Sequence, residues 1–171
     1  VESVQNGVAE LGFVMGLGEQ SDVGAETFFA GDMVCVMNEN HPLVSRASVS
    51  PRDLRGQAFI ALEQGTRMGT IVRSAFKKVD EPFRFSVEVR YCNTACVLAE
   101  SGVGVAVVDP LSGRFNNHGN LVIRPFLPAS EVAASFIRSL KRPISRAADQ
   151  FLREVRHVAS ETAARVSSAV S

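Results

Sequence analysis

One short segment, Glu63-Gln64-Gly65-Thr66-Arg67, carries the side chains that could bind a carboxylate. It follows a predicted strand, residues 57–62, and opens a predicted helix that places Met68, Ile71 and Val72 at helical spacing. Free amides at a helix N-terminus attract anions, and a hydroxyl and a guanidinium add donors. In the alternative, this is a solvated loop with Thr66 as a cap. The predicted ligand contacts here are Gln64, Gly65, Thr66 and Arg67.

Two more polar positions flank the segment Ala95 to Val108, which predicts a helix, a turn at Gly102 and a buried strand. Asn93 or Thr94 precedes the small and apolar residues of the helix, so either can cap it and also contact a ligand. Asp109 follows the strand. It could pair with a ligand ammonium, or it could cap a helix that has Pro110 at its first position.

The residues that most often perform catalysis or bind metals are scattered. The histidines, at 41, 118 and 157, lie far apart, and no nucleophile, base and orienting group can be assembled with confidence. Cys92 and Cys96 have no histidine nearby in sequence, which favours packed thiols over a redox or nucleophilic role. We therefore predict no catalytic residues, no metal site and no cofactor.

Composition excludes several classes of protein. The chain has 171 residues, of which 46% are hydrophobic, and a net charge of zero. These values indicate a globular protein that does not itself bind nucleic acid. No apolar run approaches the roughly 20 residues of a membrane span. Three cysteines imply no disulfide framework, which fits a reducing compartment. The chain does not begin with Met, and we expect it to be a fragment.

Predicted strands alternate with predicted helices along the chain. This alternation favours an α/β fold with mostly parallel strand pairing. The predicted strands are residues 11–16, 27–37, 57–62, 83–90, 103–108, 121–126 and 132–140, and the longer predicted helices are residues 68–78, 94–101 and 143–166.

The order of several motifs closely resembles the effector-binding domain of LysR-type transcriptional regulators. Each motif is weak alone, but together they cover nearly the whole chain at the usual spacing. The endings Val108-Asp109-Pro110 and Arg142-Pro143 resemble the branch that senses basic amino acids and opines. The motifs are His41-Pro42-Leu43, Pro51-Arg52-Asp53-Leu54, Phe59-Ile60, Gly102 to Pro110, Leu121 to Phe126 and Lys141-Arg142-Pro143.

The resemblance implies a two-lobed fold like that of type II periplasmic binding proteins. Residues 1–30 and 131–171 would form an incomplete regulatory subdomain I, and residues 31–130 would form regulatory subdomain II. Strands near 28–34 and 126–134 would connect the lobes. A winged helix-turn-helix domain, a linker helix and the first strand-helix-strand should precede Val1.

The resemblance also implies a function and partners. The domain would bind an amino acid, opine or other carboxylate effector between the lobes and control DNA binding in the cytoplasm. It would form a homodimer or homotetramer, with the helix from Met68 to Lys78 facing a partner through Arg73 and Lys77. A transport-type periplasmic solute-binding protein of the same fold is the alternative, and an enzyme is disfavoured because no acid–base pair is found.

Overall fold

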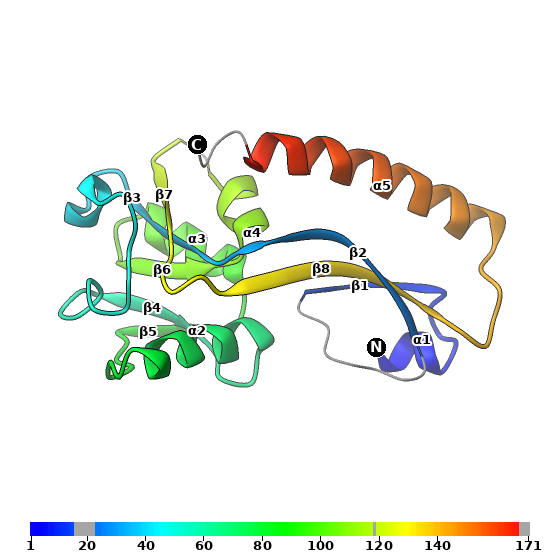
Figure 1. The fold of residues 1–171 in the computed structure, drawn as a ribbon, viewed down its shortest axis with the longest axis horizontal. Helices are drawn as coiled ribbons and strands as arrows, with labels where there is room; N and C mark the ends of the chain where they lie inside the picture. The colour runs from blue at the N-terminus through cyan, green and yellow to red at the C-terminus, as the bar shows by residue number, and fades with distance from the viewer. Residues whose placement is uncertain (16–22, 118, 168–171) are drawn as a thin grey trace. The chain divides into compact units, whose positions relative to one another are not determined.

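The computed structural model describes residues 1–15, 23–117 and 119–167 (Figure 1). Most of the loop predicted for residues 17–25 lies outside these ranges, and strand β2 already begins at Val23. The chain forms two compact units. Unit 1 contains Val1–Ala30 and Ala133–Ser171, and unit 2 contains Gly31–Val132. The chain passes between the units along strands β2 and β8, whose ranges span the two boundaries.

Unit 1 is built on a three-stranded sheet with the order β1-β8-β2. Its elements are α1 (Glu2–Gln5), β1 (Leu11–Met15), β2 (Val23–Asp32), β8 (Glu131–Ser139) and α5 (Arg146–Ser167). Strands β1 and β8 are antiparallel, with Phe13 opposite Phe136. Successive side chains of a strand point to opposite faces, so Phe136 and Ile137 pack on different sides of the sheet.

Both faces of this sheet are covered. On one face Ile137 packs with Val23 and with Val4 of α1. On the other face Phe13 contacts the Phe151 ring of α5, with ring centroids 5.9 Å apart. Helix α5 runs along that face (Figure 1). It starts after Ser145, whose backbone N and Oγ donate to the Glu10 carboxylate at 3.0 and 2.8 Å.

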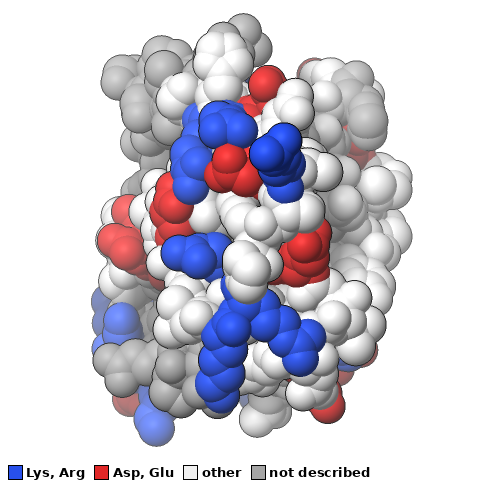
Figure 2. All heavy atoms as spheres, turned by 90° about the vertical axis from the view of Figure 1, so that its right-hand side faces the viewer, with Lys and Arg blue, Asp and Glu red and all other residues white. Residues whose placement is uncertain are grey.

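Charges of both signs lie on the exposed end of unit 1. Figure 2 shows basic side chains beside acidic ones over most of that face, with one group of basic side chains in the lower part of the view. On α5, Arg153 pairs with Asp149 at 2.9 Å, and Arg156 pairs with Glu26 of β2 at 2.7 Å. These arginines form part of a solvated, mixed-charge surface, as their spacing on the helix predicts.

Unit 2 is built on a five-stranded sheet with the order β5-β4-β6-β3-β7. Its strands are β3 (Val34–Asn38), β4 (Phe59–Leu62), β5 (Val87–Val89), β6 (Val105–Val108) and β7 (Leu121–Pro125), and its helices are the 3-10 helix η1 (Pro42–Ser45), α2 (Arg67–Lys78), α3 (Cys92–Glu100) and α4 (Pro110–Phe115). Strand β4 is parallel to both β5 and β6, whereas β3 is antiparallel to β6 and β7.

The expectation of mostly parallel pairing is therefore wrong. Parallel neighbours need a long crossover, and here α2 and α3 supply the crossovers that join β4, β5 and β6. Because the chain moves outward through α2 and back through α3, right-handed crossovers put the two helices on opposite faces of the sheet. Helix α3 packs against β3, β4 and β6.

Several element boundaries also differ from the sequence prediction. The predicted strand 27–37 is divided between β2 and β3, because the amide of Met33 bonds to Ser130 O and not to a strand neighbour. The predicted strand 83–90 shortens to β5, because Phe83 packs its ring on Phe59 and Phe76. The sequence Ser50 to Leu54, with Ser before Pro, predicts one capped turn of helix, and the structure has a hydrogen-bonded turn there in which the Asp53 carboxylate accepts from Ser50 N.

Two helices of unit 2 end in the same motif with different residues. Gly102 has φ +79° and the following amide, Val103 N, bonds to Leu98 O, which confirms the predicted left-handed end of α3. At the end of α2 the equivalent residue is Asp80, with φ +53°, and Glu81 N bonds to Phe76 O. A side chain in this conformation is strained, so Asp80 weakens the end of α2.

We expect Asp80→Gly to stabilise the protein by about 0.5–1 kcal/mol, because glycine removes the clash of Cβ in the left-handed conformation. Urea unfolding followed by circular dichroism measures the change. Asp80→Ala is the matched control and should lower stability, since it keeps Cβ and loses the polar side chain. Equal stability of the two variants would contradict the assignment.

A titratable side chain holds the start of η1. The His41 Nδ1 accepts from Leu43 N at 3.2 Å, and burial lowers the pKa of His41 below its ordinary value of 6.5. The fold therefore favours the neutral ring. Neutral His41 contributes fully to the stability of the folded protein above the unfolded pKa of 6.5. This contribution is lost as the pH falls through the lower pKa of the folded state.

We expect His41→Asn to remove part of the stability loss between pH 7 and pH 5, because the Asn oxygen caps η1 without titrating. Thermal unfolding of both proteins at half-unit pH steps gives the comparison. The parent and the variant contain the same carboxylates, so the stability change that comes from carboxylate titration cancels when the two curves are subtracted. Parallel curves for parent and variant would show that His41 does not contribute.

Candidate functional site

The carboxyl ends of β4, β5 and β6 meet at one edge of the unit 2 sheet, because these strands are parallel. Leu62 lies beside Val89 in this register, and Glu63 N continues the pairing by donating to Val89 O at 2.9 Å. Helices α2, α3 and α4 each begin within a few residues of this carboxyl edge. Every residue predicted to contact an effector therefore lies at or next to it.

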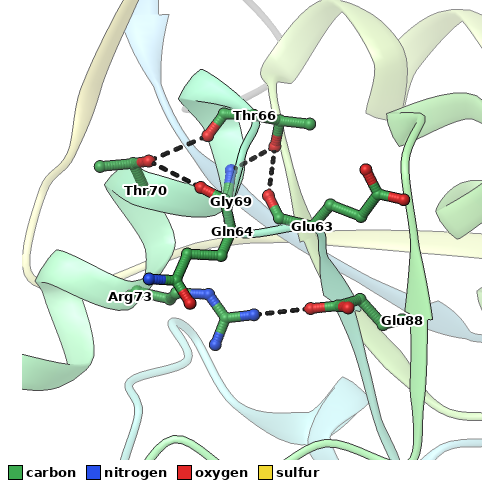
Figure 3. A network of polar contacts seen from close by, with 7 residues as sticks. All are labelled: Glu63, Gln64, Thr66, Gly69, Thr70, Arg73 and Glu88. Carbon is green, nitrogen blue, oxygen red and sulfur yellow. Dashed lines mark hydrogen bonds and ion pairs between the residues drawn. The ribbon is translucent and has the colours of Figure 1, made fainter.

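The Thr66 hydroxyl caps α2 and is largely occupied (Figure 3). It donates to Glu63 O at 2.7 Å and accepts from Gly69 N at 3.0 Å. The turn is tight, since a Cβ on residue 69 would lie 2.0 Å from Glu63 O. Thr70 Oγ1 adds bonds to Gln64 O and Thr66 O at 3.2 and 3.0 Å. The cap predicted as the alternative is present, and the Arg67 and Met68 amides of α2 have no acceptor among the described residues.

The side chains of Gln64 and Arg67 are exposed at this turn. Within the described residues neither makes a hydrogen bond or an ion pair, so both are available to a ligand. Gly65 is also exposed, and no atom lies within 4 Å of the position of a Cβ there.

Helix α3 begins without a side-chain cap. Its N-cap is Tyr91, which makes no capping bond, so the expectation that Asn93 or Thr94 caps this helix is wrong. The helix starts two or three residues earlier than that expectation requires, because Tyr91 O already accepts from Ala95 N at 3.1 Å. Asn93 accepts from the side chain of Asn116 at 3.2 Å, and Thr94 is exposed.

Without a side-chain cap, the first backbone amides of α3 are left as hydrogen-bond donors. The amides of Cys92, Asn93 and Thr94 have no hydrogen-bond acceptor among the residues that the structure describes. Unsatisfied amides at a helix N-terminus carry partial positive charge and favour an anion. This is the strongest anion-binding feature of the carboxyl edge.

Asp109 caps α4. Its Oδ1 accepts from Ser112 N at 2.8 Å, Pro110 follows as the first helical residue, and the residue is buried with 4% of its surface exposed. This geometry is the capping alternative expected from the sequence. Pairing of Asp109 with a ligand ammonium stays a prediction.

The thiols beside Asp109 are poor nucleophiles. Burial, followed by the charge of Asp109, raises the pKa of Cys92 and of Cys96 to about 12. Cys96 also donates to Ser112 O at 3.6 Å. Both cysteines therefore pack as neutral side chains at physiological pH.

An ion pair at the carboxyl edge was not anticipated from the sequence. Arg90 Nη1 lies 3.0 Å from Glu63 Oε2, and both side chains are substantially exposed. Each residue directly follows a strand, β5 or β4, and the two strands are parallel neighbours. Opposite charges immediately after two adjacent parallel strands are the sequence signal that would have found the pair.

Two cavities of unit 2 lie away from this edge. Cavities of about 310 and 550 Å³ lie in unit 2, and none of the predicted effector residues lines either one. Across residues 1–15, 23–117 and 119–167, no group of three His, Cys, Asp or Glu side chains is placed to hold a metal ion. His118 lies outside these ranges.

Comparisons with known proteins identify the class. The family described as the LysR substrate binding domain matches residues 1–160, and the chain belongs to this family. It is 31% identical over 120 residues to the transcriptional activator protein LysR of Escherichia coli (strain K12), covering 70% of this chain and 39% of that protein. It is 27% identical over 154 residues to the octopine catabolism/uptake operon regulatory protein OccR of Rhizobium meliloti, covering 90% and 50%.

Solved structures share the fold. The regulatory domain of CcmR from Synechocystis PCC6803, in complex with 2-PG, matches with a TM-score of 0.75 at 18% identity over 92% of this chain and 77% of that chain. The effector-binding domain of QuiR, in complex with shikimate, matches with a TM-score of 0.75 at 16% identity over 94% and 76%. The chain therefore has the α/β, periplasmic-binding-protein type II-like fold of LysR effector-binding domains.

The matches also bear on the alternative function, a transport-type periplasmic solute-binding protein. The curated relatives are transcriptional regulators, and a transport protein is not favoured. The chain spans about 39–50% of the length of these two relatives. Within its described residues, no helix combines the length and the apolar character that crossing a bilayer requires.

We expect Cys92 and Cys96 to react very slowly with a disulfide reagent at pH 8, because a thiol with a pKa of about 12 is a thiolate in about one molecule in ten thousand. Absorbance after adding the reagent to native protein gives the rate. All three cysteines should react rapidly in guanidinium chloride, which is the control. Equal rates in the native and unfolded states would contradict the raised pKa values.

Proposed function

We propose that this chain is the effector-sensing part of a LysR-type transcription factor and binds a small zwitterion or carboxylate at the carboxyl edge of the unit 2 sheet. The observation that carries the proposal is the uncapped start of α3, where three amides lack acceptors within the described chain. Shikimate, found in complex with QuiR, is a carboxylate of the kind that such amides bind. The preferred effectors of this chain are an amino acid or an opine.

The charged side chains at the carboxyl edge support an effector that carries both a carboxylate and an ammonium group. Arg90 and Glu63 pair with each other at the surface, where an ion pair is worth little and exchanges readily. A ligand carboxylate would replace Glu63 beside Arg90 and lie against the α3 amides. A ligand ammonium would then bind Glu63. The exposed Gln64 and Arg67 complete the polar surroundings.

Regulation would require the effector to favour one conformation of the intact protein. We assign residues 1–30 with 131–171, and residues 31–130, to the two regulatory subdomains. The effector would control DNA binding through an N-terminal winged helix-turn-helix domain outside this sequence, in the cytoplasm, and we assign no catalytic step to this chain.

Self-association is part of the same proposal. The homodimer or homotetramer would use α2, which carries Arg73 and Lys77. Arg73 already bonds to Glu88 at 2.7 Å (Figure 3). It also covers the Phe83 ring, with 4.0 Å between its guanidinium carbon and the ring centroid. Lys77 is exposed and is the freer contact for a partner.

We expect Thr94→Ala to weaken binding of lysine or octopine by the intact regulator, by roughly 1–2 kcal/mol if one hydrogen bond is lost. Its stability should not change, because Thr94 caps nothing. Thr66→Ala should lose about 1 kcal/mol of stability as a cap. Titration calorimetry and thermal unfolding separate the two effects.

The controls are Thr94→Ser and Thr66→Ser, which keep the hydroxyl groups. Arg90→Gln tests the charge that should face the ligand carboxylate, and it should weaken binding of both compounds. If all variants bind as tightly as the parent, the carboxyl edge is not the effector site.

A further inference from the structure

The 550 Å³ cavity of unit 2 lies at the amino ends of β4 and β5, at the opposite end of the same strands from the carboxyl edge. Gln57 precedes β4 there, and Ser86 precedes β5 and donates its amide to Phe59 O at 2.9 Å. The volume is within the range of small-molecule sites, about 300–1,000 Å³. We name this space the amino-edge cavity.

A fixed guanidinium lines the amino-edge cavity. Arg55 donates from Nε and Nη2 to the two carboxylate oxygens of Glu81, each at 2.8 Å. The Glu81 side chain is only 4% exposed, whereas that of Arg55 is 73% exposed. The fork holds one side of the guanidinium against a buried carboxylate, so the remaining N–H groups are held in place and turned away from Glu81.

A second guanidinium is available beside it. Arg84 also lines the cavity, is exposed, and forms no hydrogen bond or ion pair with any residue in the described part of the chain. The cavity lining thus has two guanidinium groups and one carboxylate, and that carboxylate is already satisfied. The excess charge is positive, and the free donors suit an anion.

Apolar side chains supply much of the remaining lining, beside Gly56, Gln57 and Ser86. These apolar side chains are Pro51, Leu54, Phe76, Pro82 and Phe85. Phe85 leaves 45% of its surface exposed at the edge of an aromatic cluster, 5.9 Å from the Phe83 ring. A flat apolar group on a ligand would cover Phe85 and pack in the geometry that aromatic pairs favour.

We propose that the amino-edge cavity is a second small-molecule site and that it binds a carboxylate with an aromatic body. The carboxylate bonds to Arg84 and to the outer N–H groups of Arg55, and the ring lies on Phe85 and Pro82. This site shares no residue with the carboxyl edge. Helix α2 extends between the two, since it starts after Thr66 and contributes Phe76 to the amino-edge cavity.

Phenylacetate is the probe for this site, added to the ¹⁵N-labelled 171-residue chain. Saturable shifts are expected at the amides of Gly56, Gln57 and Ser86. Acetate lacks the ring and phenylacetamide lacks the charge, so each should bind at least about fivefold more weakly. Equal affinity for acetate, or shifts confined to the carboxyl edge, would overturn the proposal.

Arg84→Gln keeps a polar side chain and removes the free charge, so it should weaken phenylacetate at least about fivefold without lowering the melting temperature. Arg55 is left intact, because its loss would leave Glu81 buried without a partner. Arg146→Gln, at an exposed arginine of α5 in unit 1 and outside both sites, is the matched control and should bind like the parent. An Arg84→Gln protein that binds phenylacetate as the parent does would refute the site.

Discussion

The parallel pairing of β4 with β5 and β6 is the constraint on which the rest of unit 2 depends. It places three strand ends at one edge and therefore three helix starts beside one another. It also requires α2 and α3 as crossovers on opposite faces of the sheet. The tight start of α2 follows from this packing, because Gly69 approaches Glu63 O too closely for any side chain.

The three helices at the carboxyl edge differ in how their first amides are satisfied. Thr66 caps α2 and Asp109 caps α4, so each of these helices uses one polar side chain internally. Helix α3 has Tyr91 at this position and leaves its amides open. A cap and a ligand compete for the same donors, so α3 offers an anion one more amide than α2, whose Gly69 amide is taken by Thr66.

The two ends of β4 and β5 present different chemistry. At the carboxyl edge, the charges of Glu63 and Arg90 are exposed, so water screens them and they can exchange partners. At the amino edge, Glu81 is buried and forms two bonds with Arg55. Removal of Arg55 would leave the buried Glu81 carboxylate without a compensating charge. The exposed Glu63–Arg90 pair can therefore be replaced by a ligand, whereas the Arg55–Glu81 pair holds the Arg55 guanidinium in a fixed position.

The sequence by itself determined the family, the alternation of strands and helices, the starts of α2 and α4 and the end of α3, because these depend on local patterns such as Thr66 before α2, Pro110 after Asp109 and the left-handed Gly102. It could not determine which residue starts α3, since a shift of two residues moves the N-cap from Asn93 to Tyr91. The prediction of mostly parallel strands was wrong, because β3 and β7 become antiparallel neighbours only through pairing distant in sequence. Contacts such as Arg90 with Glu63 and Arg55 with Glu81 join residues 26 or 27 positions apart, and only the tertiary structure brings them together.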